Sequence, residues 1–111
     1  MSGAIKATGA VDIGGTKIAV GIVDRDGKLL AREETPTIAA AGFEVAMERV
    51  ELMIERLRSR VAVTLEGIGV GCTGPVDPFT GEIGNVEFLP GWQGANPVRS
   101  LAGIRRCRSH R

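Results

Sequence analysis

The feature that most constrains this chain is a polar turn between two apolar segments, in the stretch "VDIGGTKIAVGIVDRDGKLL" at residues 11–30. Val11 and Ile13 alternate with a polar residue before the turn, and apolar residues recur at every second position from Ile18 onward. A period of two is typical of β-strands with one buried face. The sequence therefore predicts a short first strand, a tight reversal, and a second strand antiparallel to it.

A second turn and a third strand continue this pattern. The run Asp24-Arg25-Asp26-Gly27 combines turn-forming side chains with a glycine, which can adopt the positive φ that such loops often need. Residues 29–35 then predict a third strand, so the first three strands form an antiparallel meander. Ala19 and Gly21 give the second strand one face of small side chains, and we expect another element to pack closely against it.

A helix is predicted after Pro36, because apolar side chains recur there at three- and four-residue spacing. They are Phe43, Ala46, Met47, Val50, Met53, Ile54 and Leu57. Ile68 and Val70, flanked by glycines, predict a short buried strand, and residues 83–86 a short extended piece. Residues 98–102 are compatible with a further short helix. The order β-β-β-α-β, with this possible helix, places the chain in the mixed α/β class.

Composition and charge exclude several classes of protein. The 111 residues contain no apolar run near the ~18 that a membrane span needs, and the N-terminus is a poor signal peptide. Cys72 and Cys107 lack metal-ligand spacing. Residues 1–104 hold 10 basic and 13 acidic side chains, and the remaining basic residues lie in the tail at 105–111. We therefore expect a cytoplasmic protein without nucleic-acid or membrane partners.

The first turn has the chemistry of a phosphate site. Gly14 and Gly15 have no Cβ, so a ligand oxygen can approach their N–H groups closely. The hydroxyl of Thr16 and the ammonium of Lys17 could face the same anion. Asp12 would repel a bare phosphate but attract the Mg²⁺ that accompanies nucleotide phosphates. The alternative, on these residues alone, is an ordinary tight hairpin with a solvated acid and lysine.

Two other glycine patterns compete with this interpretation. Gly69-x-Gly71-x-x-Gly74 matches the dinucleotide-binding fingerprint, which requires a helix directly behind the glycines. Pro75 and Pro78 make such a helix improbable, and no acidic residue lies about 20 positions beyond Gly74 to bind a ribose. A P-loop needs Gly-Lys-Ser/Thr after four spacer residues, and this run does not occur.

Two segments carry a resemblance to a known family. "DIGGTKIAVGIVDRDGKLL" resembles the phosphate-1 hairpin of the actin-like sugar kinase and ATPase superfamily, and its Asp-Ile-Gly-Gly-Thr-Lys form is similar to the ROK family. "GIGVGCTGPVDPFTGEIGNVEFLPGW" is similar to the sugar-side segment of ROK glucokinases. The resemblance implies the fold of an incomplete actin-like, ribonuclease H-like N-terminal lobe.

The same resemblance implies an ATP-dependent phosphoryl transfer to a hexose hydroxyl. ATP phosphates and Mg²⁺ would be held by the hairpin, with Asp12 at the metal; the residues are Asp12, Gly14, Gly15, Thr16 and Lys17. The residues that would border the hexose are Gly74, Pro75, Val76, Asp77 and Asn85. An Asn amide suits that task because it can both donate to and accept from sugar hydroxyls. Trp92 is expected to serve packing.

The sequence also departs from the family pattern. The resemblance places the catalytic aspartate in a Glu-Asn-Asp segment, and the 111 residues contain none, so no catalytic residue is assigned. The family's zinc cluster has no counterpart either. Residues 1–104 are expected to form the kinase-like part and residues 105–111 a basic tail outside the family, which suggests a truncation or frameshift near Gly103. An unpaired sheet edge is expected to favour self-association.

These observations predict an N-terminal fragment of a glucokinase-like hexose kinase that is inactive alone. Two alternatives remain. One is a fragment of a ROK-type sugar-responsive repressor, although only about ten residues precede Val11, too few for a helix-turn-helix. The other is an inert remnant.

Overall fold

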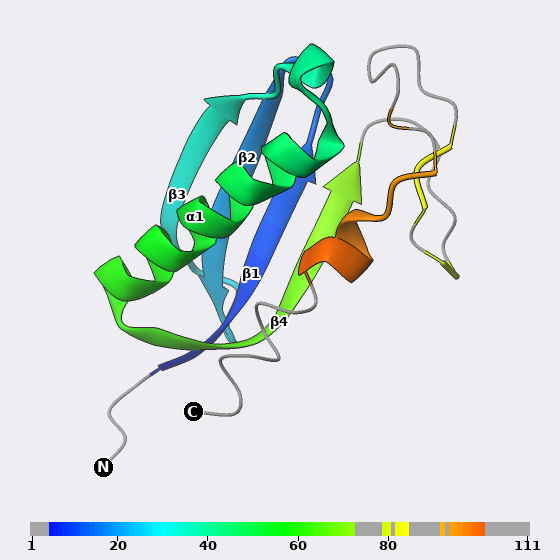
Figure 1. The fold of residues 1–111 in the computed structure, drawn as a ribbon. Coiled ribbons are helices and arrows are strands. Elements are labelled where there is room, and N and C mark those ends of the chain that lie inside the picture. Colours follow the sequence, from blue (N-terminus) through cyan, green and yellow to red (C-terminus); the bar gives the residue numbers. More distant parts are fainter. Residues whose placement is uncertain (1–4, 73–78, 81, 85–91, 93, 102–111) are drawn as a thin grey trace.

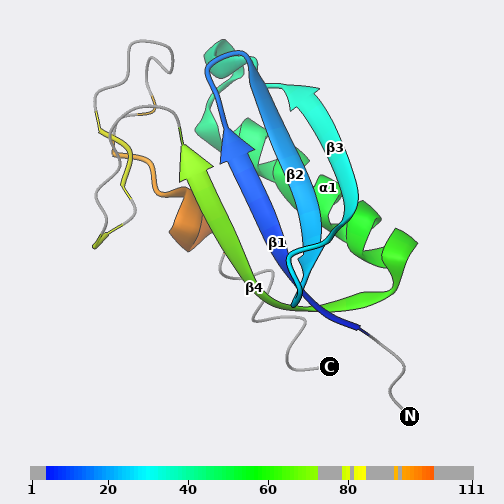
Figure 2. The same cartoon turned by 180° about the vertical axis from the view of Figure 1, so that it is seen from behind.

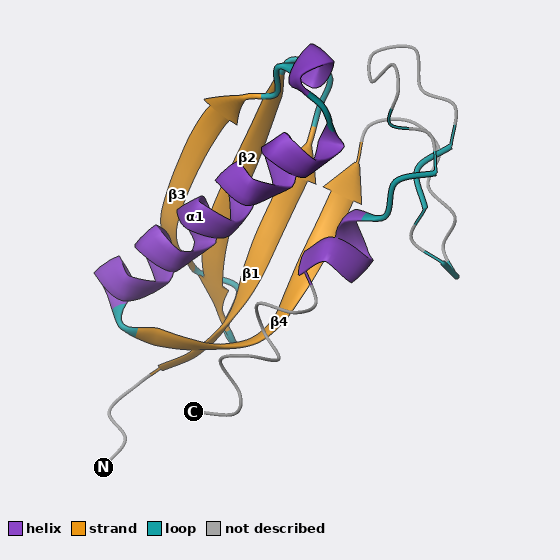
Figure 3. Cartoon of the chain, viewed as in Figure 1, coloured by secondary structure: helices purple, strands orange, loops and turns teal. Residues whose placement is uncertain are grey.

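The computed structural model describes residues 5–72, 79–80, 82–84, 92 and 94–101. In this part, four strands form one sheet, and a long helix lies across one face of it (Figures 1 and 3). The elements in chain order are β1 (Ile5–Ile13), β2 (Lys17–Asp24), β3 (Leu29–Pro36), the 3₁₀ turn η1 (Ala39–Ala41), α1 (Phe43–Val61) and β4 (Val63–Cys72). The predicted α/β class and the order β-β-β-α-β are confirmed.

The strand order in the sheet is β3-β2-β1-β4. β1 pairs with β2 and β2 with β3 in antiparallel fashion, which confirms the predicted meander. β4 returns through α1 and pairs with β1 in parallel. In this register Ile13 lies opposite both Ile18 of β2 and Cys72 of β4. The ends of β1 and β4 therefore meet beside the turn that joins β1 to β2.

The lengths of β1 and β4 were predicted wrongly. β1 has nine residues rather than a short run around Val11, and β4 has ten residues and begins at Val63. Ile68 and Val70 are half-buried rather than fully buried. In β1 the missed inward positions carry Ala7 and Gly9, whose small side chains hide the period of two. Long-range pairing between the two strands supplies the hydrogen bonds that local propensity does not predict.

The helix covers the sheet as the sequence predicts. Its buried side chains all come from the predicted apolar set. They meet inward-facing residues of the strands, among them Ile13, Ile18, Val20 and Ile22, all with no exposed surface. Burial of this apolar surface is the main force that holds α1 on the sheet.

The C-terminal part of the described chain extends the same layer. The N–H of Ile83 donates to Ala95 O at 2.8 Å, and residues 97–101 form a short helix. The Asn96 side chain caps this helix by accepting from the N–H of Arg99 at 2.9 Å. In Figure 1 this helix, drawn in orange, lies on the same side of the sheet as α1. The predicted extended residue at 83 and the predicted second helix are both present.

Trp92 is a packing residue, as expected. It is 1% exposed, its Nε1 donates to Ala39 O at 3.1 Å, and its ring meets that of Phe43 edge to face at 5.4 Å. This contact joins the C-terminal segment to the start of α1.

The opposite face of the sheet carries no helix in the described part of the chain (Figure 2). The small residues expected to receive a closely packed element lie here. A Cβ built on Gly21 would lie 3.0 Å from a side-chain carbon of Leu29, so β3 packs closely against this small residue, although no helix covers it in the described residues. Within those residues, no helix is long and apolar enough to cross a membrane.

Candidate phosphate-binding hairpin

The turn between β1 and β2 is closed by one internal hydrogen bond, from the N–H of Gly14 to Lys17 O at 2.9 Å. Gly14 is needed here for space. A Cβ at this position would lie 3.0 Å from Lys17 O, whereas the positive-φ glycines of the described chain are Gly27, Gly42 and Gly94. We call residues 12–17 the phosphate hairpin.

The phosphate hairpin presents several polar groups that have no partner among the described residues. The N–H groups of Gly15 and Thr16, the Thr16 hydroxyl and the Asp12 carboxylate form no hydrogen bond or ion pair there. Gly14 and Gly15 are half-buried, and Asp12 and Thr16 are exposed. Since polar groups of folded chains are normally bonded, this set of accessible donors beside a carboxylate is prepared for a ligand or for water.

Thr37, a residue that sequence reasoning did not select, holds the hairpin from behind. It follows β3, has no exposed surface, and donates from its hydroxyl to Gly14 O at 2.7 Å. Its N–H donates to Thr16 O at 2.9 Å. The contacts join positions 23 and 21 residues apart in the chain, so no local sequence signal identifies them.

Lys17 is engaged by a neighbouring carboxylate. Its Nζ lies 3.4 Å from Glu34 Oε2, and Glu34 also pairs with Arg32. The hydrogen bond from Arg32, with a smaller contribution from Lys17, holds the pKa of Glu34 below its usual value. The Lys17 ammonium was expected to face an anion, but here a carboxylate partly neutralises it.

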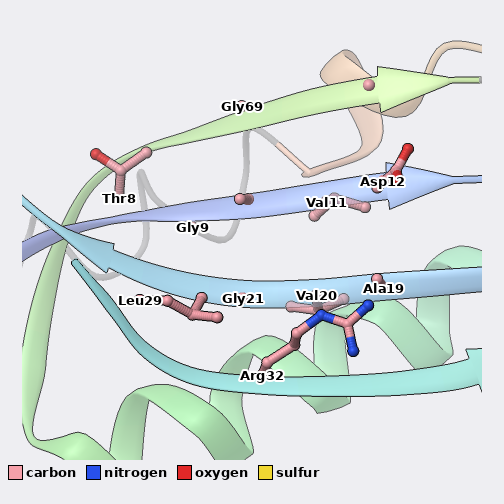
Figure 4. A pocket seen from close by; sticks show the side chains of 12 residues that line it. Thr8, Gly9, Val11, Asp12, Ala19, Val20, Gly21, Leu29, Arg32 and Gly69 are labelled. Atoms are coloured by element: carbon pink, nitrogen blue, oxygen red, sulfur yellow. The ribbon is translucent and has the colours of Figure 1, made fainter. Parts of the chain in front are cut away.

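Asp12 lies on the open face of the sheet, at the end of an elongated hollow (Figure 4). The hollow has a volume of about 480 Å³, and its lining includes Ala19, Gly21, Gly69 and Arg32. Burial, and to a smaller extent the charge of Asp12, raises the pKa of the neighbouring Cys72, so Cys72 is a neutral thiol at pH 7. Of these two side chains, the Asp12 carboxylate is therefore the one whose charge suits a hard cation.

A single carboxylate is compatible with Mg²⁺ that is bound together with phosphate. No group of three His, Cys, Asp or Glu side chains that could enclose an ion occurs in the described ranges. Mg²⁺ in nucleotide sites keeps several waters and binds one or two carboxylates plus phosphate oxygens. The donor set at Asp12 fits that mode of binding.

The two glycine-rich candidates can now be compared. Gly69 and Gly71 lie inside β4, with Gly71 opposite Asp12 in the register, so these two glycines belong to a strand rather than to a loop.

The predicted sugar-bordering residues lie outside the described residues. They are Gly74, Pro75, Val76, Asp77 and Asn85.

Comparison with known proteins decides the family. The model of the ROK family matches residues 8–102, which is most of the chain. The chain belongs to the ROK family. Among curated relatives, it is 36% identical over 67 residues to a glucokinase of Streptomyces coelicolor, covering 60% of this chain and 20% of the relative. It is 38% identical over 65 residues to an N-acetylmannosamine kinase of Citrobacter koseri, covering 56% and 22%.

Solved ROK structures share the fold. The ROK hexokinase of Thermus thermophilus superposes with a TM-score of 0.78 at 33% identity, covering 90% of this chain and 32% of that one. A ROK glucokinase of Streptomyces griseus, in complex with glucose and AMPPNP, gives a TM-score of 0.72 at 25% identity, covering 94% and 30%. The chain thus corresponds to an N-terminal part of these kinases and spans about a fifth of the curated relatives' length.

Proposed function

We propose that this chain is the nucleotide-phosphate-binding part of an ATP-dependent ROK hexose kinase. The observation that carries the proposal is the phosphate hairpin, where unpaired amides, a hydroxyl and a carboxylate come together on a turn of a ROK-type lobe. The ligands of the Streptomyces griseus relative, glucose and an ATP analogue, support this choice of substrates.

Each group in the hairpin has a task in this proposal. The N–H groups of Gly15 and Thr16 and the Thr16 hydroxyl donate to phosphate oxygens, which gain from donors already fixed in place. Asp12 would hold Mg²⁺, which would neutralise negative charge on the ATP phosphates. Gly14 keeps the turn tight because any side chain would press on Lys17 O.

The sugar side rests on the resemblance of residues 67–92 to ROK glucokinases. Gly74, Pro75, Val76, Asp77 and Asn85 would border a hexose. Relatives at 36% and 38% identity act on different sugars according to their names. The proposal therefore names hexoses as a class, with glucose as the first to test.

Phosphoryl transfer needs a group that accepts the proton of the attacking hydroxyl. The Glu-Asn-Asp segment that would supply it does not occur in these 111 residues. We propose that the chain by itself binds the magnesium nucleotide without transferring phosphate.

Titration calorimetry with Mg-AMPPNP tests this proposal. The 111-residue chain should bind, and Asp12→Asn should weaken binding more than about tenfold, because the variant loses the metal's carboxylate but keeps the side-chain shape. Asp26→Asn, an exposed acid at the far end of β2, is the matched control and should bind like wild type.

Three outcomes separate the alternatives. No binding by the wild-type chain would support the inert remnant. Binding that Asp12→Asn leaves intact would place the nucleotide elsewhere. Glucose-dependent release of ADP from ATP by the chain alone would contradict the proposed lack of transfer.

A further inference from the structure

Thr37 is the one buried polar side chain among the described residues, with 0% of its surface exposed. A buried hydroxyl is costly unless it is hydrogen-bonded. Thr37 meets this requirement by binding the phosphate hairpin, since its hydroxyl donates to Gly14 O and its N–H donates to Thr16 O. One residue therefore fixes two carbonyl groups of the turn.

The direction of these carbonyls fixes the direction of the neighbouring amides. A peptide group is planar and trans, so its C=O and N–H point in opposite directions. Gly14 O shares a peptide with the N–H of Gly15, and Thr16 O shares one with the N–H of Lys17. With both carbonyls turned toward Thr37, these two N–H groups must point away from it.

Thr37 is itself held by Arg49 of α1. The half-buried guanidinium donates from Nη2 to Thr37 O at 2.5 Å and from Nη1 to Pro36 O and to the Thr35 hydroxyl, the latter at 3.2 Å. Within the described part of the chain, Arg49 forms no ion pair with a carboxylate. Its donors are instead used on the backbone that carries Thr37.

We propose that Thr37 and Arg49 are positioning residues that aim the phosphate hairpin, so that Arg49 orients Thr37 and Thr37 orients the amides of Gly15 and Lys17. The inference rests on the proposed function, because the Gly15 amide is one of the two amides proposed to bind a nucleotide phosphate. Neither residue contacts the ligand in this arrangement. They act by fixing donors before the ligand arrives, which lowers the cost of ordering the turn on binding.

Two substitutions at position 37 separate the hydroxyl from the rest of the side chain. Thr37→Val keeps the shape but removes the donor to Gly14 O, and Thr37→Ser keeps the donor. We expect Thr37→Val to weaken Mg-AMPPNP binding about tenfold and Thr37→Ser to stay within about threefold of wild type. Arg49→Met, which keeps the apolar stem, should behave like Thr37→Val. Thr64→Val, on the exposed side of β4, should have no effect.

A structural role alone must be distinguished from positioning. Ile54→Val shortens a fully buried side chain of α1 that is not among the hydrogen-bond partners of the turn, and it provides a variant that loses stability without losing the hairpin contacts. Binding is measured well below the unfolding temperature of every variant. If Ile54→Val weakens nucleotide binding as much as Thr37→Val does, the positioning role is contradicted.

NMR of the backbone amides reports on the conformation of the phosphate hairpin in the absence of ligand. In Thr37→Val, the Gly15 and Lys17 amide resonances should shift and broaden relative to wild type, while Thr37→Ser restores them. Unchanged Gly15 and Lys17 resonances in Thr37→Val would overturn the proposal. If instead the wild type fails to bind nucleotide but these resonances respond, the proposed function fails and the aiming of the turn stands.

Discussion

The two turns at the ends of β2 have the same topology but are stabilised in opposite ways. The Asp24–Lys28 turn closes on itself: Asp24 Oδ1 accepts from the N–H groups of Asp26 and Lys28 at 2.9 Å, and the N–H of Gly27 donates to Asp24 O at 3.1 Å. Gly27 has the left-handed φ of 85° that this loop requires. The Asp24 carboxylate and the amides of this turn are therefore used in hydrogen bonds within the turn.

The phosphate hairpin leaves its own groups unused and is held from outside. Asp12 has no hydrogen-bond or ion-pair partner among the described residues, and the carbonyls of Gly14 and Thr16 are bound by Thr37 rather than by the turn itself. A turn whose polar groups are all hydrogen-bonded within the turn is stable, but it has no free donors or acceptors for a ligand. The difference shows how one sheet can carry a structural turn at one end and a candidate ligand site at the other.

Replacing the acid of each turn by alanine gives the largest expected effect. Asp12→Ala should weaken Mg-AMPPNP binding more than about tenfold and leave the free energy of unfolding nearly unchanged. Asp24→Ala should lower that free energy by about 1–2 kcal/mol, because two charge-assisted hydrogen bonds are lost, and leave binding unchanged. Calorimetry and urea unfolding measure the two quantities. If both variants lose stability equally, the contrast between the turns is wrong.

Adding a methyl group to each turn sharpens the comparison. Gly27→Ala forces alanine into a left-handed conformation in open space, which should cost about 1–2 kcal/mol of stability without changing nucleotide affinity. Gly14→Ala presses a Cβ against Lys17 O and should cost about 1–3 kcal/mol and also weaken binding.

Gly69→Ala is the control for both glycine substitutions, because its Cβ meets no atom within 4 Å in the described structure. It should unfold at the same urea concentration as wild type or a slightly higher one. A Gly14→Ala variant with wild-type affinity would show that the tight turn is not needed for the ligand.

Acidification should weaken the attachment of β3, which directly precedes Thr37, to α1, which carries Arg49. Glu33 of β3 binds both Arg56 and Arg60 of α1, and the hydrogen bond from Arg56 contributes most to a lowered pKa of Glu33. A lowered folded-state pKa stabilises the fold above the unfolded value near 4.5 and is lost as pH falls through the folded value. Urea unfolding at pH 7 and pH 3 should show a smaller difference for Glu33→Gln than for wild type; equal differences would contradict this.

The smallest expected effect concerns Lys17. Glu34→Gln removes the carboxylate that partly neutralises its ammonium, so affinity for Mg-AMPPNP should rise about twofold, as for an exposed charge pair. The increase should disappear at high salt, because exposed charges are screened. Glu82→Gln, an exposed acid distant in sequence, serves as the control.

The sequence by itself determined the meander, the helix and the chemical character of the turn. The period of two around Ile18 and the three- and four-residue spacing in α1 are local patterns, and burial of one face per element follows from them. The resemblance to ROK kinases also rests on contiguous residues, and the family match over residues 8–102 confirms it. The polar groups of the hairpin were therefore named before their geometry was known.

The tertiary structure alone decided how that hairpin is held. The parallel pairing of β1 with β4, the full lengths of those strands, the engagement of Lys17 by Glu34 and the contacts of Thr37 and Arg49 all join residues distant in sequence. Such contacts depend on which elements become neighbours when the apolar faces are buried. A local pattern can therefore predict a turn and its donors, but the direction in which those donors point is fixed by the elements packed behind it.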